Sequence, residues 1–204
     1  MKLYNSMGPN PHVVRMFAAE AGVELELEDI DLMAGANRQA DFLAINPAGQ
    51  LPCLELGDGQ CIAEVTAICE YLDEISEAPS LLGDTPEQRA NTRMWTRRVD
   101  LNISEPLTNG FRYAEGLAIF KDRMITIPAA ADGLKQIARE KLSWLDGLMG
   151  DGRAFVAGDN ITLADVLLYC MLAFGNQVGQ PFDESLPHIK PWFDRMSARP
   201  SASA

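Results

Sequence analysis

The stretch NPAGQLPCLE at residues 46–55, followed by EVTAICEYL at residues 64–72, predicts a turn, a strand, a hairpin, a second strand and a helix. Pro52 stands directly before the apolar alternation of the first strand, a position where proline is tolerated and where an X–Pro bond can be cis. A cis turn would leave the backbone N–H and C=O of Leu51 free to pair with an extended ligand. Glu64 places a carboxylate at a helix start, where backbone N–H groups point outward. These stretches predict a site for a peptide-like ligand that carries an amine and a carboxylate.

The first 80 residues show the pattern of a mixed α/β domain. The expected elements are a strand at 2–4, a helix that has Pro11 in its first turn and ends at Gly22, a strand at 25–30, a weak helix at 37–43, a hairpin with its turn at 57–59, and a helix from 64 to about 76. A parallel βαβ unit joined to a hairpin and a final helix is a thioredoxin-like layout.

The sequence APSLLGDTP at 78–86 predicts a linker, because it carries proline, glycine and serine. Beyond it only helical patterns occur. The expected helices are 87–107 with Pro106 near a bend or end, 122–148 with Pro128 kinking it or delaying its start, 163–174 and 186–198. Thr162 and Asp165 form a variant of the capping box, which is a folding signal. The predicted domains are an α/β domain at 1–80 and an all-helical domain at 87–204.

The net charge of −12 argues against nucleic acid or anionic lipid as a partner, since neither half of the chain is net basic. Most of the acidic excess lies in residues 1–80. No apolar run approaches the roughly 20 residues of a membrane span, and the first residues lack the apolar core of a signal peptide. Two histidines and four cysteines without metal-ligand spacing make a zinc site unexpected. We expect reduced, buried cysteines and a cytoplasmic protein without a membrane partner.

Four pieces of the chain resemble the cytosolic glutathione transferase family over essentially its whole length: the 46–52 turn, the 64–72 helix start, the linker and the Thr162–Asp165 box. Residues 9–12 are similar to the bacterial nu class, and residues 94–102 to bacterial and yeast relatives with an atypical active site. The resemblance implies an N-terminal thioredoxin-like domain, a C-terminal helical bundle and a homodimer. It also implies a detoxifying transferase that uses glutathione as co-substrate and no metal, and whose glutathione thiolate attacks a small electrophile.

The resemblance bears on which group stabilises that thiolate. Family members use a Tyr, Ser or Cys just after the first strand to lower the pKa of a thiol whose free value is roughly 8.5. This chain has Asn10 at the matching position, and Tyr4 is expected within the strand. The hypothesis assigns thiolate stabilisation to Asn10, to the backbone at the helix start and to Ser6. The alternative is that Asn10 is an N-cap and that Ser6 is an ordinary loop residue.

Gln50, Leu51 and Glu64 match the glutathione contacts of the family, in the turn that contains Pro52. The implied roles are a side-chain amide bond to the ligand backbone, pairing with the cysteinyl backbone and capture of the γ-glutamyl amine. Val65 replaces the usual Ser or Thr, so the hydroxyl contact to the γ-glutamyl carboxylate is lost or moved to the next residue. The backbone N–H of Val65 can still serve.

Arg38 and Gln39 lie where relatives place a polar or basic group against the glycine carboxylate of glutathione. An exposed helix arginine is the alternative for Arg38. In the helical domain, the arginines at 89, 93 and 97 repeat every four residues and predict an interdomain or dimer contact, or else a solvated basic face. Candidates for the electrophile pocket are Ser104, Asn109, Phe111, Arg112, Tyr113 and Phe120.

Two other functions fit the same residues. The first is glutathione-dependent disulfide reduction, which needs no C-x-x-C motif when glutathione supplies the thiols. The second is a non-catalytic ligand-binding module of the same fold, which Val65 and the missing Tyr, Ser or Cys favour.

Overall fold

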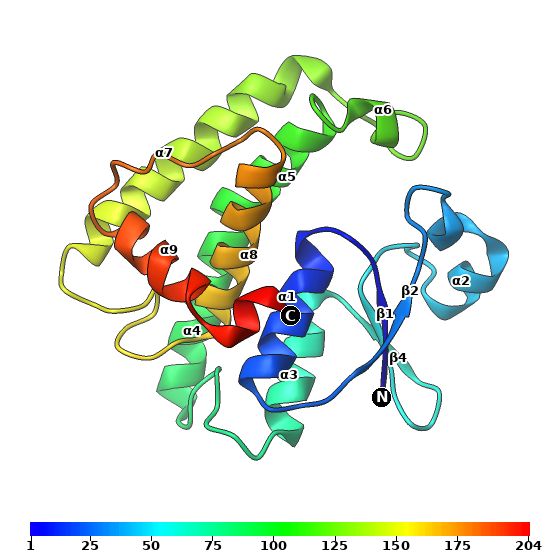
Figure 1. Cartoon of the computed structure of the whole chain (residues 1–204), viewed down its shortest axis with the longest axis horizontal. Helices are drawn as coiled ribbons and strands as arrows, with labels where there is room; N and C mark the ends of the chain where they lie inside the picture. The colour runs from blue at the N-terminus through cyan, green and yellow to red at the C-terminus, as the bar shows by residue number, and fades with distance from the viewer. The chain divides into compact units, whose positions relative to one another are not determined.

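The computed structural model describes all 204 residues and divides them into two compact units. The first unit comprises Met1–Leu82 together with Pro200–Ala204, and the second comprises Gly83–Arg199. The first unit contains a four-stranded sheet with helices on its faces, and the second contains only helices and loops (Figure 1). The predicted fold class, a thioredoxin-like unit followed by a helical bundle, is confirmed.

The sheet has the strand order β2-β1-β3-β4. The strands are β1 (Lys2–Asn5), β2 (Glu26–Asp29), β3 (Cys53–Glu55) and β4 (Cys61–Ala63). β1 pairs parallel with β2 and antiparallel with β3, and β3 pairs antiparallel with β4. The expected βαβ unit and hairpin are therefore both present, with the 57–59 turn between β3 and β4.

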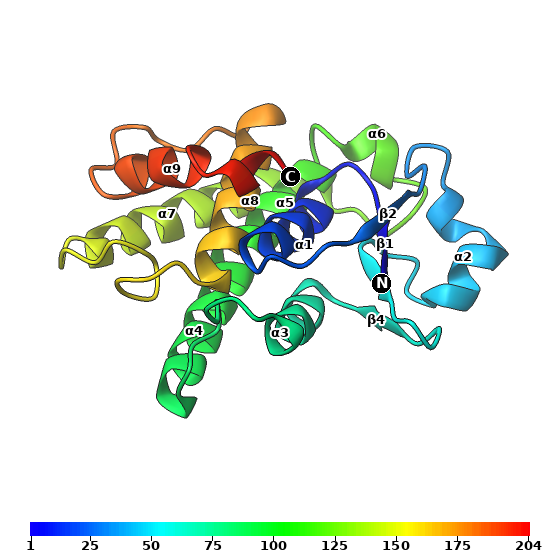
Figure 2. The ribbon, with the colours of Figure 1, turned by 60° about the horizontal axis from the view of Figure 1, so that its bottom comes forward.

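Helices cover both faces of this sheet. They are α1 (Pro9–Glu20), α2 (Ala40–Ile45) and α3 (Val65–Ile75). α1 and α3 lie on one face and α2 on the other (Figures 1 and 2). Side chains alternate along the strands accordingly: Leu3 and Leu54 are fully buried partners, while Tyr4 and Cys53 pack with Phe42 of α2. The helix expected at 37–43 is divided into a 3-10 turn, Ala36–Arg38, and α2, because the backbone of Gln39 is extended.

The last five residues of the chain pack with the first unit. Their 3-10 turn, Pro200–Ser203, lies against α1. His12 Nε2 lies 3.0 Å from the carbonyl oxygen of Ala202, and Arg15 Nε donates to the carbonyl of Ala204 at 3.2 Å. These contacts join α1 to a segment that is remote in the sequence.

The helical unit contains eight helical segments. They are α4 (Pro86–Val99), a π-helical segment (Asp100–Ser104), α5 (Glu105–Arg112), α6 (Leu117–Phe120), a 3-10 turn (Pro128–Ala130), α7 (Ala131–Met149), α8 (Leu163–Gln177) and α9 (Ile189–Ser197). The prediction that the first helix bends or ends near Pro106 is wrong in its end point. The π-helical segment changes the hydrogen-bond register just before the proline, and the helix continues to Arg112. Pro128 delays the start of α7, as predicted.

Capping boxes begin two of these helices. The predicted box at α8 is present, and the Asp165 carboxylate accepts from the backbone N–H of Thr162 at 2.9 Å. A second box at the start of α4 joins Thr85 and Gln88. This box was not predicted, although the spacing TPEQ is the pattern that identifies such a box.

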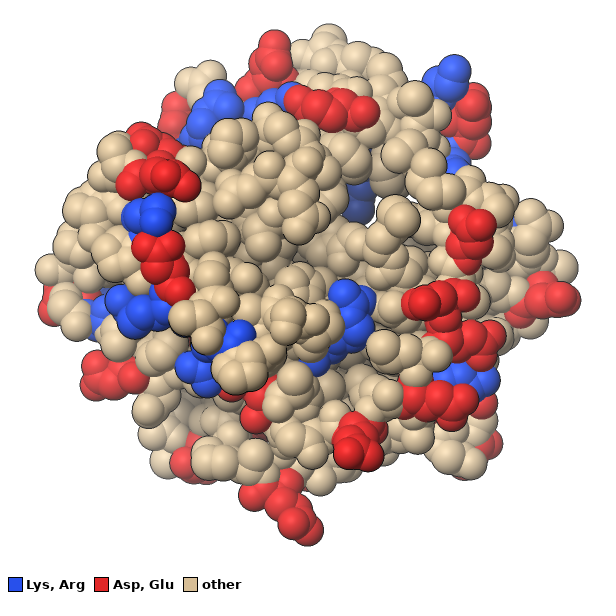
Figure 3. Space-filling model, viewed as in Figure 1, with Lys and Arg blue, Asp and Glu red and all other residues tan.

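Acidic side chains dominate the part of the surface that covers β1, β2 and α2, on the right of Figure 3. This distribution agrees with the acidic excess of the first 80 residues. None of the four cysteines forms a disulfide. Cys53, Cys69 and Cys170 are buried, as the sequence predicts, whereas Cys61 is only half-buried. None of the helices has the length and apolar character that crossing a membrane requires.

Candidate functional site

Several connections of the first unit meet at one end of the strands, which we call the sheet edge. The strand register pairs Tyr4 with Cys53, and Cys53 in turn with Ala63. Since both pairs are antiparallel, the chain leaving β1, the chain entering β3 and the chain leaving β4 lie at the same edge. The segments brought together there are the loop Ser6–Gly8, the Leu51–Pro52 dipeptide and Glu64 with the start of α3.

The backbone of Leu51 is available at this edge. The Leu51–Pro52 peptide bond is cis, as the sequence analysis expects. Neither the N–H nor the C=O of Leu51 makes a hydrogen bond within the chain. The neighbouring Gln50 side chain is exposed and also has no partner in the chain. The dipeptide therefore offers a donor and an acceptor to an extended ligand, as an unpaired strand edge does.

Glu64 occupies the N-cap position of α3 with an unusual backbone. Its φ of 71° makes it the one non-glycine residue of the chain with a positive φ. L residues rarely adopt such a conformation, and those that do cluster at ligand-binding sites. The Glu64 carboxylate is exposed, and no side chain caps α3. The helix therefore presents a free carboxylate together with the unsatisfied N–H groups of Val65 and Thr66, a combination suited to an amine and a carboxylate.

The loop after β1 places Ser6 and Asn10 at the beginning of α1. The helix starts at Pro9, and Gly8, with a φ of 123°, holds the N-cap position. The interpretation of Asn10 as an N-cap is therefore wrong, since Asn10 is the second residue of the helix. Its half-buried side chain has no hydrogen-bond partner in the chain. Ser6 is buried, and its hydroxyl donates to the carbonyl of Met7 at 3.2 Å.

Two other groups near this edge are unsuited to activating a thiol. The Tyr4 hydroxyl donates to the Glu55 carboxylate at 2.5 Å, and this hydrogen bond together with burial raises the pKa of Tyr4. Burial, with a contribution from Cys61, raises the pKa of Cys53 to about 12. The only proton of the Tyr4 hydroxyl is thus donated to Glu55 and not to a ligand, which agrees with leaving Tyr4 without a catalytic role, and the Cys53 thiol stays protonated near neutral pH.

Arg38 and Gln39 differ in their surroundings. Arg38 is exposed on the 3-10 turn, and its Nη1 donates to the carbonyl of Ala48 at 3.3 Å. Gln39 is exposed at the N-cap position of α2 and makes no capping hydrogen bond. Arg38 thus contacts the turn before Leu51, whereas Gln39 makes no hydrogen bond to that turn.

A hollow of about 420 Å³ lies beside the loop after β1. Its lining consists of Ser6 and Met7 from that loop, Asp29 at the end of β2 and residues 30–33 that follow it. A volume of this size is in the range of small-molecule sites. Met7 and residues 29–33 were not predicted as site residues, because only the parallel pairing of β1 with β2 brings residues 29–33 beside this loop.

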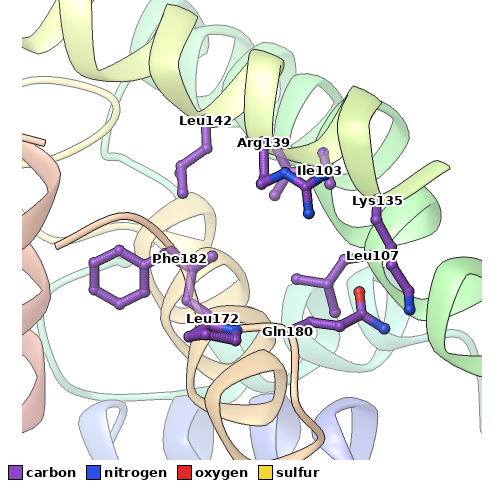
Figure 4. Close-up of a pocket in the computed structure, with 10 residues that line it drawn as sticks. Ile103, Leu107, Lys135, Arg139, Leu142, Leu172, Gln180 and Phe182 are labelled. Atoms are coloured by element: carbon purple, nitrogen blue, oxygen red, sulfur yellow. The ribbon is translucent and has the colours of Figure 1, made fainter. Parts of the chain in front are cut away.

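The candidate electrophile-pocket residues of the helical unit have mostly structural contacts. Phe111 packs its ring edge-on against Phe120 and Phe174. Arg112 donates to the side chain of Asn109 at 2.9 Å. A separate cavity of about 30 Å³ lies among α5, α7 and α8, lined by Leu107, Leu142, Leu172 and their neighbours (Figure 4). It has room for about one water molecule and none for a substrate.

Two arginines of α4 have partners nearby in the sequence. Arg89 donates to the carbonyls of Gly83 and Asp84, and Arg97 forms an exposed ion pair with Asp100. No group of three or more His, Cys, Asp or Glu residues is arranged to hold a metal ion.

Comparison with known proteins agrees with this architecture. Residues 1–74 match the family model of the glutathione S-transferase N-terminal domain, and residues 117–200 match that of the C-terminal domain. The chain is 33% identical over 201 residues to glutathione S-transferase 2 of Saccharomyces cerevisiae, which covers 95% of this chain and 84% of the yeast protein. It is 31% identical over 159 residues to human elongation factor 1-gamma, covering 77% of this chain and 34% of the human protein.

Solved structures agree as well. A glutathione S-transferase domain-containing protein of Marinobacter aquaeolei superposes with a TM-score of 0.93 at 33% identity, covering 99% of this chain and 100% of that one. Gtt2 of S. cerevisiae superposes with a TM-score of 0.91 at 29% identity, covering 100% and 99%. The two family models and the near-complete overlap with the yeast enzyme lead to one assignment. The chain belongs to the glutathione S-transferase family.

Proposed function

We propose that this chain is a glutathione transferase that holds glutathione at the sheet edge formed by Leu51 and Glu64. The observation that carries the proposal is the unpaired backbone of Leu51 beside a free carboxylate at an uncapped helix start. The Leu51 backbone would pair with the cysteinyl residue of glutathione, and Glu64 would bind its γ-glutamyl amine. Gln50 would contact the ligand backbone through its side-chain amide.

The proposed reaction begins with ionisation of the bound thiol, whose proton leaves to solvent. The thiolate then attacks an electrophilic carbon, so that an S–C bond forms and the leaving group departs with its electron pair. Asn10 lacks a partner in the chain and lies in the first turn of α1, where the helix dipole favours negative charge. Its amide N–H is a donor to the thiolate, whereas it cannot accept the proton. The hollow beside Ser6 and Met7 is the candidate site for the electrophile.

Substitution of Asn10 by alanine tests this assignment. Because a hydrogen bond to a charged group contributes about 1.5–3 kcal/mol, its loss is expected to raise the pKa of bound glutathione by about 1–2 units. Ultraviolet absorbance of the thiolate, recorded across a pH titration of the complex, measures that pKa directly. The variant Ser6→Ala, measured in parallel, separates the contribution of the loop hydroxyl. An unchanged pH profile in Asn10→Ala would remove Asn10 from the mechanism.

A non-catalytic ligand-binding module is the second candidate. Two observations favour it: Val65 stands where a hydroxyl would bind the γ-glutamyl carboxylate, and the chain is similar to part of elongation factor 1-gamma. The same titration distinguishes the two candidates. Bound glutathione with a lowered thiol pKa supports the transferase, and absence of glutathione binding supports the module.

We also propose that the protein is a homodimer in which α4 contributes to the interface. Met94 and Arg97 of α4 and Leu101 of the π-helical segment that continues it are exposed at spacings of three and four residues, which places two apolar side chains and a cation on one helical face. The acidic surface of a partner's first unit would complement the arginines. Replacing Arg93 and Arg97 by glutamate is expected to shift the dimer toward monomer in sedimentation velocity. An unchanged sedimentation coefficient would count against this interface.

A further inference from the structure

Side chains hold each of the three backbone carbonyls that precede Leu51. The donor–acceptor pairs are Arg38 Nη1 to Ala48 O at 3.3 Å, Asn37 Nδ2 to Gly49 O at 2.6 Å, and Asn46 Nδ2 to Gln50 O at 2.8 Å. Asn46 also accepts from the backbone N–H of Ala48 at 3.1 Å. The turn is therefore fixed from two directions, by Asn46 from within it and by the 3-10 turn beside it. The first residue beyond these bonds is Leu51, whose own backbone is unpaired.

Asn37 makes the shortest of these contacts and is 4% exposed. Its Oδ1 atom is buried and has no hydrogen-bond partner. Burying an amide with one group unsatisfied costs stability, and an apolar side chain of similar shape would avoid that cost. The buried amide is therefore poorly explained by stability alone, whereas its Nδ2 group has a defined task at Gly49.

Gly49 shows how closely the two segments fit. Its φ is 60°, and a Cβ atom there would lie 3.0 Å from the carbonyl oxygen of Asn37. The backbone of the 3-10 turn thus approaches the glycine directly, with the Asn37 side chain bridging to the Gly49 carbonyl. This bridge orients the peptide plane two residues before Leu51.

We propose that Asn37 is a positioning residue for glutathione, which acts by fixing the turn at residues 48–50 so that the Leu51 backbone faces the ligand. This inference rests on the proposed function and adds a residue that touches neither glutathione nor the electrophile. Without the Asn37 bond the turn samples other orientations. Part of the free energy of glutathione binding is then used to order the turn, so the affinity falls. The effect is expected on glutathione binding and not on the chemical step.

The variant Asn37→Leu tests the proposal, because leucine keeps the approximate shape and neutral charge of asparagine but cannot donate. We expect the glutathione Kd from calorimetry and the glutathione KM to rise about five- to twentyfold, in keeping with loss of preorganisation. At saturating glutathione, kcat and the KM of the electrophile are expected to stay within about twofold of wild type. Asn91→Leu is the matched control, since Asn91 Nδ2 donates to the carbonyl of Ala157 at 2.8 Å within the helical unit.

The outcomes separate this inference from the proposed function. If the wild-type chain binds no glutathione, the proposed function fails. If wild type binds glutathione and Asn37→Leu binds it as tightly as Asn91→Leu does, the positioning role is wrong. A fall in kcat equal to the rise in KM would also overturn it. Should Asn37→Leu not fold, Asn37→Ser, which keeps a hydroxyl too short to reach Gly49 in the same way, is measured with the same expectations.

Discussion

Replacing Asp165 by asparagine is expected to lower the free energy of unfolding of the helical unit by about 3–5 kcal/mol, the cost of disrupting a buried charged network. Asp165 is fully buried. Its Oδ1 accepts from Val156 N at 2.8 Å and Trp192 Nε1 at 2.9 Å, and its Oδ2 accepts from Thr162 N and Oγ1, each at 2.9 Å. In asparagine one of these oxygens becomes an NH₂ group, which cannot accept from the backbone or indole N–H groups that face it. At least one hydrogen bond is therefore lost, and its donor stays buried without an acceptor.

Urea unfolding followed by tryptophan fluorescence measures this loss, because Trp192 is itself one of the donors and reports on the helical unit. Burial raises the pKa of Asp165 while its hydrogen bonds act in the opposite direction, so all variants are compared at one pH. Asp183→Asn is the matched control. Asp183 accepts from Ser185 N at 2.8 Å in an exposed loop, and its substitution is expected to leave the midpoint unchanged. A loss below about 1 kcal/mol in Asp165→Asn would mean that the network contributes little.

The Asp165 carboxylate makes some hydrogen bonds that the sequence predicts and others that it does not. The spacing between Thr162 and Asp165 predicts the capping box, because a cap is formed by residues close in the chain. The bonds to Val156 and Trp192 join residues that lie 9 and 27 positions away, and no local pattern contains them. The sequence therefore predicts that Asp165 caps a helix but not that it ties the start of α8 to α9.

The residues of the candidate site also differ in how far the sequence predicts them. Leu51, Pro52 and Glu64 were predictable because strand period and helix-start chemistry are local signals, and the antiparallel register then places them together. Pro11 lies in the first turn of α1, as predicted, and the helix begins two residues earlier at Pro9, which also suits a first helical turn. The hydrogen bond from Asn37 to Gly49 was not predicted, because it joins residues twelve positions apart through a 3-10 turn that the helical pattern obscured.

Replacing Glu64 by glutamine is expected to weaken glutathione binding on the order of tenfold to a hundredfold, which corresponds to loss of a charge-assisted hydrogen bond. The Glu64 carboxylate is exposed and has no partner in the chain, so the substitution removes charge without breaking a contact of the folded protein. Glutamine also has the same shape, which keeps the backbone strain at a φ of 71° the same in both proteins. Calorimetric titration with glutathione measures the change in Kd.

Glu74→Gln provides the matched control, because Glu74 is an exposed carboxylate in the last turn of the same helix. It removes an equal charge far from the sheet edge. Any loss of glutathione affinity that both variants share therefore reflects the change in net charge and not a contact with the amine.

Val65→Thr tests the neighbouring position in the opposite direction. Threonine keeps the shape of valine and restores the hydroxyl that relatives place there, so binding is expected to strengthen by about three- to tenfold, the worth of one hydrogen bond. If Glu64→Gln binds as wild type does, the amine of glutathione is held elsewhere. A weaker Glu64→Gln together with an unchanged Val65→Thr would mean that the γ-glutamyl carboxylate is already satisfied, by the backbone N–H groups at the start of α3.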